Sequence, residues 1–162
     1  MTDQTSSINI GGGIQTGTGM TGTAPAAKPP APAVGGYHWG TGRRKTAVAR
    51  VRIKPGSGKF VIHGREIKDY FYDPRYQADV VAPLKATKSI GKFDVFVNVR
   101  GGGQTGQAGA IVMGIARALC KADPTLEPIL RDGKYLTRDS RKVERKKPGQ
   151  PGARKRFQFS KR

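Results

Sequence analysis

Residues 93–120 constrain the fold more than any other stretch, because a strand pattern there runs through a cluster of glycines into a helix pattern. Apolar and polar residues alternate over 93–100, the spacing of a strand with one buried face. Over 108–121 the apolar residues recur at helical spacing. Gly109 and Gly114 should weaken this helix by roughly 1 kcal/mol each relative to alanine. We therefore expect them to permit close packing of the helix on its strand.

The strand and the helix are separated by four glycines, which we predict to form a structural hinge: Gly101, Gly102, Gly103 and Gly106. Residues without a Cβ adopt backbone angles that are closed to others and let a second backbone approach. Their spacing also matches the G-x-G-x-x-G motif of dinucleotide-binding folds. That motif needs an acid at the end of a second parallel strand, whereas Asp123 follows the helix and precedes Pro124. The pattern favours a tight strand-to-helix turn over a nucleotide site.

Charge limits the class of partner. The 162 residues include 30 Lys and Arg against 11 Asp and Glu, a formal net charge of +19. Such a balance is atypical of metabolic enzymes and favours a polyanion, with nucleic acid as the leading candidate. No apolar run approaches the length of a membrane-spanning helix, so no membrane partner is expected. Cys120 is the one cysteine and the histidines number two, so neither an internal disulfide nor a metal or other cofactor is expected.

Composition divides the chain into three segments. Residues 1–36 contain no aromatic residue, one acid and one base, and we predict a disordered low-complexity N-terminal extension. They lack the apolar core of a secretory peptide and the arginines of a mitochondrial presequence, which makes the cytoplasm the default location. Residues 37–136 suffice for one modest core and are predicted to form a globular α+β body. Residues 137–162 are predicted to form an extended basic C-terminal tail.

The body starts with basic residues. Three adjacent cations come directly before a predicted strand at residues 46–54: Arg43, Arg44 and Lys45. On that strand, apolar residues facing a core alternate with Arg50, Arg52 and Lys54. We expect the basic face to meet an anion, with an ordinary solvated face as the alternative. The turn signal at residues 55–58 predicts that residues 59–62 return as the hairpin partner of this strand.

Short helices are predicted in the rest of the body. One spans residues 66–72, where three consecutive aromatic residues are more typical of a core than of a base-stacking surface. Two further helical segments are expected at 77–81 and 84–90, interrupted by Pro83. Asp123 as N-cap with Pro124 at the first helical position predicts a final short helix.

The C-terminal segment is the most informative about the partner. Eleven bases face only two acids there, and the bases are Arg138, Arg141, Lys142, Arg145, Lys146, Lys147, Arg154, Lys155, Arg156, Lys161 and Arg162. Two Pro-Gly pairs prevent one continuous helix. If the tail neutralised about eight phosphates, affinity would fall with salt with a log-log slope of roughly 6 to 7. Phe157 and Phe159 could insert between bases or enter a protein groove.

Four motifs occur in an order that resembles the bacterial form of the small-subunit ribosomal protein nine family. They are GRRKTAVARV at 42–51, GGGQTGQAGA at 101–110 leading to GIARAL at 114–119, ERKK at 144–147, and QFSKR at 158–162. The resemblance covers residues 37–162. Residues 1–36 have no counterpart in the family.

The resemblance implies a small mixed-sheet body with a βαβ-type unit like that of the second domain of ribosomal protein five. It further implies a structural, non-enzymatic role in the head of the small subunit, without a small-molecule substrate. The implied partners are small-subunit rRNA, neighbouring ribosomal proteins of the head, and the peptidyl-site tRNA. In this family the closing Lys-Arg pair, here Lys161 and Arg162, lies near the tRNA backbone. The bases that are then expected to bind rRNA are Arg43, Arg44, Lys45, Arg50, Arg52, Arg138, Arg141, Lys142, Arg145, Lys146, Lys147, Arg154, Lys155 and Arg156.

Two other function classes fit the sequence less well. A free-standing, non-specific nucleic-acid-binding protein would explain the charge, but it would require neither the glycine hinge nor a tail of this composition. A phosphate-handling enzyme would use the hinge as a cradle, but the chain offers no convincing base, nucleophile or metal cluster.

Overall fold

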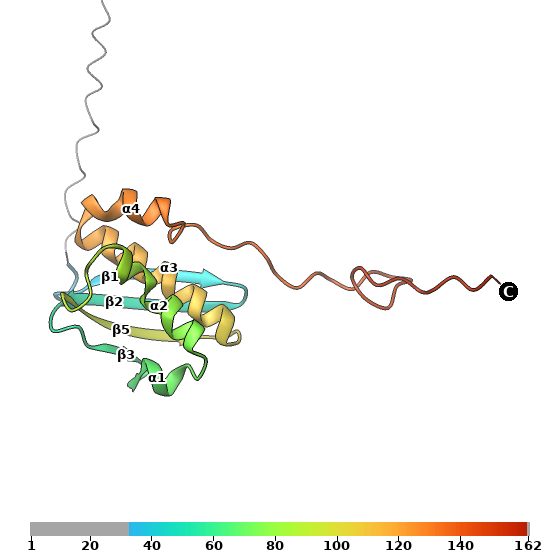
Figure 1. The fold of residues 1–162 in the computed structure, drawn as a ribbon, viewed down its shortest axis with the longest axis horizontal. Coiled ribbons are helices and arrows are strands. Elements are labelled where there is room, and N and C mark those ends of the chain that lie inside the picture. The colour runs from blue at the N-terminus through green and yellow to red at the C-terminus, as the bar shows by residue number, and fades with distance from the viewer. Residues whose placement is uncertain (1–32, 162) are drawn as a thin grey trace, which may run out of the picture.

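A mixed sheet with helices on one face forms the body of the protein (Figure 1). The computed structural model describes residues 33–161. Residues 1–32, which make up most of the segment expected to be disordered, lie outside the described residues, as does Arg162. The strands of the described part are β1 (His38–Arg44), β2 (Ala47–Pro55), β3 (Phe60–Ile62), β4 (Arg65–Glu66) and β5 (Phe93–Arg100). The helices are α1 (Ile67–Tyr70), α2 (Pro74–Ala86), α3 (Gln104–Ala122), the 3-10 turn η1 (Pro124–Leu126) and α4 (Glu127–Asp132).

The strand order is β1-β2-β5-β3-β4, and the pairing is mixed. β1 and β2 form an antiparallel hairpin, β2 pairs antiparallel with β5, and β3 pairs antiparallel with β4. β3 and β5 run parallel and are joined through α1 and α2, which makes a βαβ unit. The predicted α+β class is therefore confirmed.

β3 is not the hairpin partner of β2, and that prediction is wrong. Both edges of β2 are already occupied, by β1 on one side and β5 on the other. The loop that follows β2 is held at the start of β5, where the backbone N–H groups of Ser57, Gly58 and Lys59 donate to Asp94 Oδ1 at 2.9, 3.1 and 3.0 Å. This anchor carries the chain past the start of β5 to the far edge of that strand, where β3 pairs with it.

β1 is a strand that the sequence pattern did not reveal. Its inward positions are Gly40 and Gly42, both buried, so the strand lacks an apolar alternation. A Cβ at Gly42 would overlap the carbonyl oxygen of Ala110, and a Cβ at Gly40 would overlap that of Gly114. α3 therefore lies directly against the backbone of β1, an approach that only glycine allows.

α3 begins at Gln104, four residues before the predicted start. Gly103 is its N-cap in an extended conformation, so Gly106 lies inside the first helical turn and not in the hinge, which corrects that part of the prediction. The turn itself is made by Gly101 and Gly102, with φ of 71° and 68°. Gly109 and Gly114 do allow close packing, but on β1 and on Val51 of β2, not on the preceding strand.

α2 is one helix, not two. Asp73 caps it by accepting from the backbone N–H of Arg75 at 2.8 Å, and the helix runs on through a buried Pro83. The predicted interruption at that proline is wrong, because it lies in the last turns of the helix and packs into the core. Of the three aromatics near α1, Phe71 is fully buried, whereas Tyr72 is 81% exposed. The Asp123 cap is confirmed, since its side chain accepts from Thr125 N at 3.1 Å.

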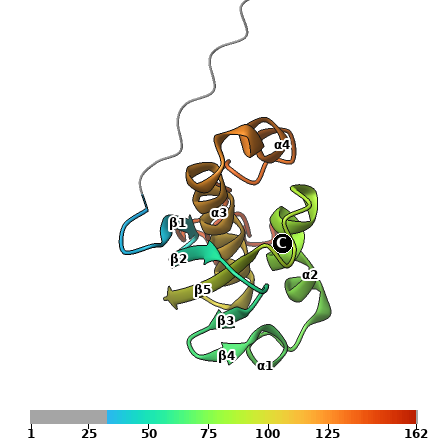
Figure 2. The same ribbon diagram turned by 90° about the vertical axis from the view of Figure 1, so that its left-hand side faces the viewer.

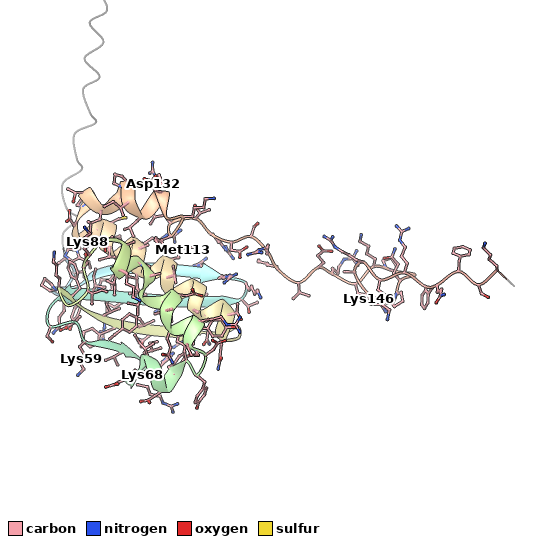
Figure 3. All side chains as sticks on the ribbon, viewed as in Figure 1. Lys59, Lys68, Lys88, Met113, Asp132 and Lys146 are labelled. Carbon is pink, nitrogen blue, oxygen red and sulfur yellow. The ribbon has the colours of Figure 1, made fainter. Side chains whose placement is uncertain are left out.

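Beyond the body, residues 137–161 contain no helix or strand and lead away from the sheet (Figure 1, Figure 3). Residues of β2, β5 and α3 form most of the core, which includes Val51, Ile53, Val97, Ile111 and Ile115. Within the described part of the chain, no helix is both long and apolar enough to cross a membrane.

Candidate nucleic-acid interface

One face of the sheet is not covered by any helix of the described residues, 33–161. Figure 2 shows α2 and α3 on the same side of the strands. The residues that point away from these helices on β1, β2 and β5 form what we call the open face: Trp39, Thr41, Arg43, Val48, Arg50, Arg52, Lys54, Phe96, Asn98 and Arg100. Successive side chains of a strand point to opposite faces of the sheet. On β2, Ala47, Ala49, Val51 and Ile53 fill the core, so the residues between them point to the open face. The expected alternation of core and basic residues on β2 is confirmed.

Strand register arranges the open face in rows. Trp39, Arg52 and Phe96 are cross-strand neighbours in the first row. Thr41, Arg50 and Asn98 make the next row, two residues further along. The third row combines Arg43, Val48 and Arg100 in the same way. Arginines therefore lie in all three rows, whereas the aromatic rings lie at one end of the face.

The aromatic end holds a cation among rings. The guanidinium carbon of Arg52 lies 5.3 Å from the ring centroid of Tyr37, 6.0 Å from that of Trp39 and 5.4 Å from that of Phe96. Tyr37 and Phe96 meet edge to face, with centroids 6.2 Å apart. We call these four residues the aromatic cluster. Each such contact is attractive because the ring face is electron-rich.

The base of the tail is tied to the body by an ion pair, which we call the tail anchor. Arg44 Nη2 donates to Asp139 Oδ2 at 2.8 Å, and Arg44 Nη1 donates to the carbonyl oxygen of Thr105 at 3.3 Å. Arg141 donates to the same carboxylate from its backbone N–H and its guanidinium. These hydrogen bonds stabilise the ionised carboxylate and hold the pKa of Asp139 well below its ordinary value, and those from the Arg141 side chain have the largest effect.

A second ion pair within the tail joins Glu144 and Arg154. Arg154 Nε donates to Glu144 Oε2 at 2.9 Å and closes a loop around the two Pro-Gly pairs. Hydrogen bonding from Arg154 lowers the pKa of Glu144. Both acids of the tail are thus engaged by arginines, and the remaining tail bases are exposed: Arg138, Lys142, Arg145, Lys146, Lys147, Lys155, Arg156 and Lys161. Phe157 and Phe159 are exposed as well.

The structure places the predicted rRNA-binding residues in several parts of the molecule. Arg43, Arg50 and Arg52 share the open face, Lys45 lies in the β1–β2 turn, and the others line the tail. Arg44 does not reach the open face, since the tail anchor and the carbonyl of Thr105 engage it.

Sequence reasoning missed the aromatic cluster and Arg100. Tyr37 and Trp39 lie at or beside a strand with glycines at its inward positions, which hid the period-two pattern. The residues on the polar side of β5, Phe96 and Arg100, were visible as alternating positions but could not be joined to Trp39 and Arg52 without the register.

Groups suited to catalysis are sparse in the described residues. No cluster of three or more His, Cys, Asp or Glu side chains within residues 33–161 is arranged to hold a metal ion. Cys120 lines an open depression together with Arg117 and Lys121. Burial raises the pKa of its thiol, which disfavours the thiolate.

Comparison with known proteins gives a consistent result. A family model described as ribosomal protein S9/S16 matches residues 42–162. Small ribosomal subunit protein uS9 of Anaeromyxobacter sp. (strain K) is 56% identical over 121 residues, which cover 75% of this chain and 93% of that protein. The proteins of the same name from Rhodopirellula baltica and Thermotoga maritima are 51% and 52% identical, over 80% and 77% of this chain and 94% and 96% of their own lengths.

Proposed function

The chain belongs to the ribosomal protein S9/S16 family, and from this premise we propose that its body and tail bind rRNA in the subunit head while the last two residues reach the peptidyl-site tRNA. The chain is a structural constituent of the small ribosomal subunit, not an enzyme. It acts in translation as part of a ribonucleoprotein that in bacteria lies in the cytoplasm.

The observation that carries the rRNA proposal is the distribution of cations. Arg43, Arg50 and Arg100 are exposed on the open face, and most bases of the tail are exposed along a segment without regular structure. Lys and Arg on such a surface bind phosphate oxygens and release counterions, which gives affinity with little sequence reading. Neighbouring ribosomal proteins of the head are proposed as further partners.

The tRNA proposal depends on reach and chemistry at the chain end. Residues 137–162, if fully extended, would span roughly 80 Å. The Glu144–Arg154 loop uses part of that length. At the end, an Arg guanidinium suits bidentate contact with phosphate and a Lys adds a mobile charge. Backbone contacts of this kind would steady a tRNA whatever its anticodon, as a site that serves every tRNA requires.

The test is a chain that ends at Ser160. We expect small subunits assembled with it to form normally, because the body and most of the tail remain, but to hold peptidyl-site tRNA more weakly. The measurement is the tRNA dissociation constant of purified subunits. A full-length variant with Lys161→Gln and Arg162→Gln loses both charges but keeps the length of the chain, and it should weaken tRNA binding to a similar extent. Unchanged tRNA affinity in both would contradict the assignment of these residues.

A further inference from the structure

We propose that the aromatic cluster on the open face is a stacking site for an unpaired RNA base, with Trp39 as the ring that the base covers. The inference rests on the proposed rRNA-binding function and deepens it, because it assigns a kind of RNA to one part of the surface. A duplex or a bare phosphate backbone would not need rings at this position, whereas a single-stranded nucleotide would.

The rings of the cluster are in place before any RNA arrives. Trp39, Arg52 and Phe96 are direct cross-strand neighbours, so the sheet fixes their spacing. The Arg52 guanidinium lies within 6.0 Å of three ring centroids, and these cation–π contacts help to hold the rings in position. Side chains that are already ordered lose little entropy on binding.

Trp39 is the most exposed member of the cluster. Tyr37, Arg52 and Phe96 are half-buried, as expected for packing partners, but Trp39 remains 41% exposed. Tryptophan offers a large apolar ring, and bases splayed out of a helix stack on such rings or on Arg guanidinium planes.

The charge beside the cluster suits the backbone of an RNA strand. Arg50 and Asn98 lie one row away, two residues along their strands, which is about 6.6 to 6.8 Å at strand spacing. These groups can contact the phosphates that flank a stacked base. Asp94 is the acid of β5 that is nearest to the cluster. Its carboxylate accepts hydrogen bonds from three backbone N–H groups of the loop that follows β2. The surface around the rings is therefore attractive to an RNA strand.

The chain contains a single tryptophan, so its intrinsic tryptophan fluorescence reports on Trp39 alone. The experiment titrates the full-length protein, at fixed salt, with a ten-nucleotide oligoadenylate, with an abasic strand of the same length, and with a short RNA duplex. All three carry phosphates, but only the first offers exposed base faces. We expect fluorescence quenching with oligoadenylate and none with the other two ligands.

Variants test the same site by a different signal, the anisotropy of a dye-labelled strand. Trp39→Ala should weaken oligoadenylate binding about 5- to 150-fold, the range that corresponds to loss of one base–aromatic stack. Its affinity for the abasic strand should not change. Trp39→Phe should retain most of the affinity. Tyr72→Ala removes an aromatic side chain that is 81% exposed and belongs to the segment between α1 and α2, not to the cluster, and it should have no effect.

The proposal is overturned if oligoadenylate leaves the fluorescence unchanged, or if Trp39→Ala weakens oligoadenylate and abasic binding equally. Either result would show that no base stacks on Trp39. Co-sedimentation of the protein with small subunits tests the proposed function separately, because a chain that enters subunits but fails the stacking assay contradicts only the present inference.

Discussion

At the scale of the residue, Gly102 has no room for a side chain. Its φ is 68°, and a Cβ there would lie 2.9 Å from the Cβ of Ala47. Gly103, the next residue, is extended at φ −101° and caps α3, and a Cβ added to it would meet no other atom within 4 Å. The sequence indicated a hinge at these glycines, but it could not separate the residue that must be glycine from the one that need not be.

Substitution should therefore have opposite effects at the two positions. Gly102→Val should lower the free energy of unfolding by about 2 kcal/mol or more, because valine is strained at positive φ and would crowd Ala47. Gly103→Ser should be neutral or stabilising, since serine is a good N-cap. Urea denaturation of both variants is the measurement. Equal destabilisation at both sites would refute this account of the turn.

Asp94 makes stability depend on pH. The backbone N–H of Lys59, followed by those of Ser57 and Gly58, holds the pKa of this carboxylate below its ordinary value of 3.8. Because the pKa is lower in the folded state, the carboxylate stabilises the fold fully above that ordinary value, and the contribution is lost as pH falls through the folded pKa. The charge on Asp94 therefore matters at neutral pH and not in strong acid.

The prediction compares the wild type with Asp94→Asn in urea at a series of pH values. The variant should be less stable at pH 7, with a constant difference down to about pH 5 and a shrinking one below about pH 4. Asp139 and Glu144 titrate in both proteins, so the difference isolates Asp94. A difference that did not change with pH would show that shape, and not charge, matters at this position.

At the scale of the element, local patterns identified β2, β5 and α3, whose periodicity is strong, but not the partners of each strand. β1 was hidden because Gly40 and Gly42 occupy its inward positions. β3 was assigned to the wrong neighbour because strand pairing depends on the Asp94 anchor, a contact 35 or more residues apart in the chain. Pairing is a tertiary property that local pattern does not encode.

The tail anchor leads to a prediction at this scale. Asp139→Asn should loosen the first residues of the tail, since the carboxylate accepts from both Arg44 and Arg141, while the body stays folded. The measurement is the heteronuclear NOE of residues 138–144 in the free protein, which should decrease. Asp132→Asn, at the end of α4, is the matched control. An unchanged NOE in Asp139→Asn would mean that the ion pair does not order the tail.

At the scale of the whole molecule, the body presents cations on one face of its sheet. Figure 3 shows the long tail that leads away from this body. Charge and motif order in the sequence were enough to predict the fold class and the family. The aromatic cluster, the tail anchor and the Glu144–Arg154 loop were not predictable, because each joins residues whose proximity arises only in the folded chain. The proposed function as a whole depends on the tail binding RNA through its charges.

The most direct test is the salt dependence of binding to small-subunit rRNA. If the tail neutralises about eight phosphates, it contributes roughly 6 to 7 to the log-log slope of the full chain, and the cations of the open face add to that. Replacing Lys142, Lys146, Lys147 and Lys155 with glutamine should reduce that slope by about 3. Equal slopes for the two proteins would contradict a tail that holds rRNA by neutralising its phosphates.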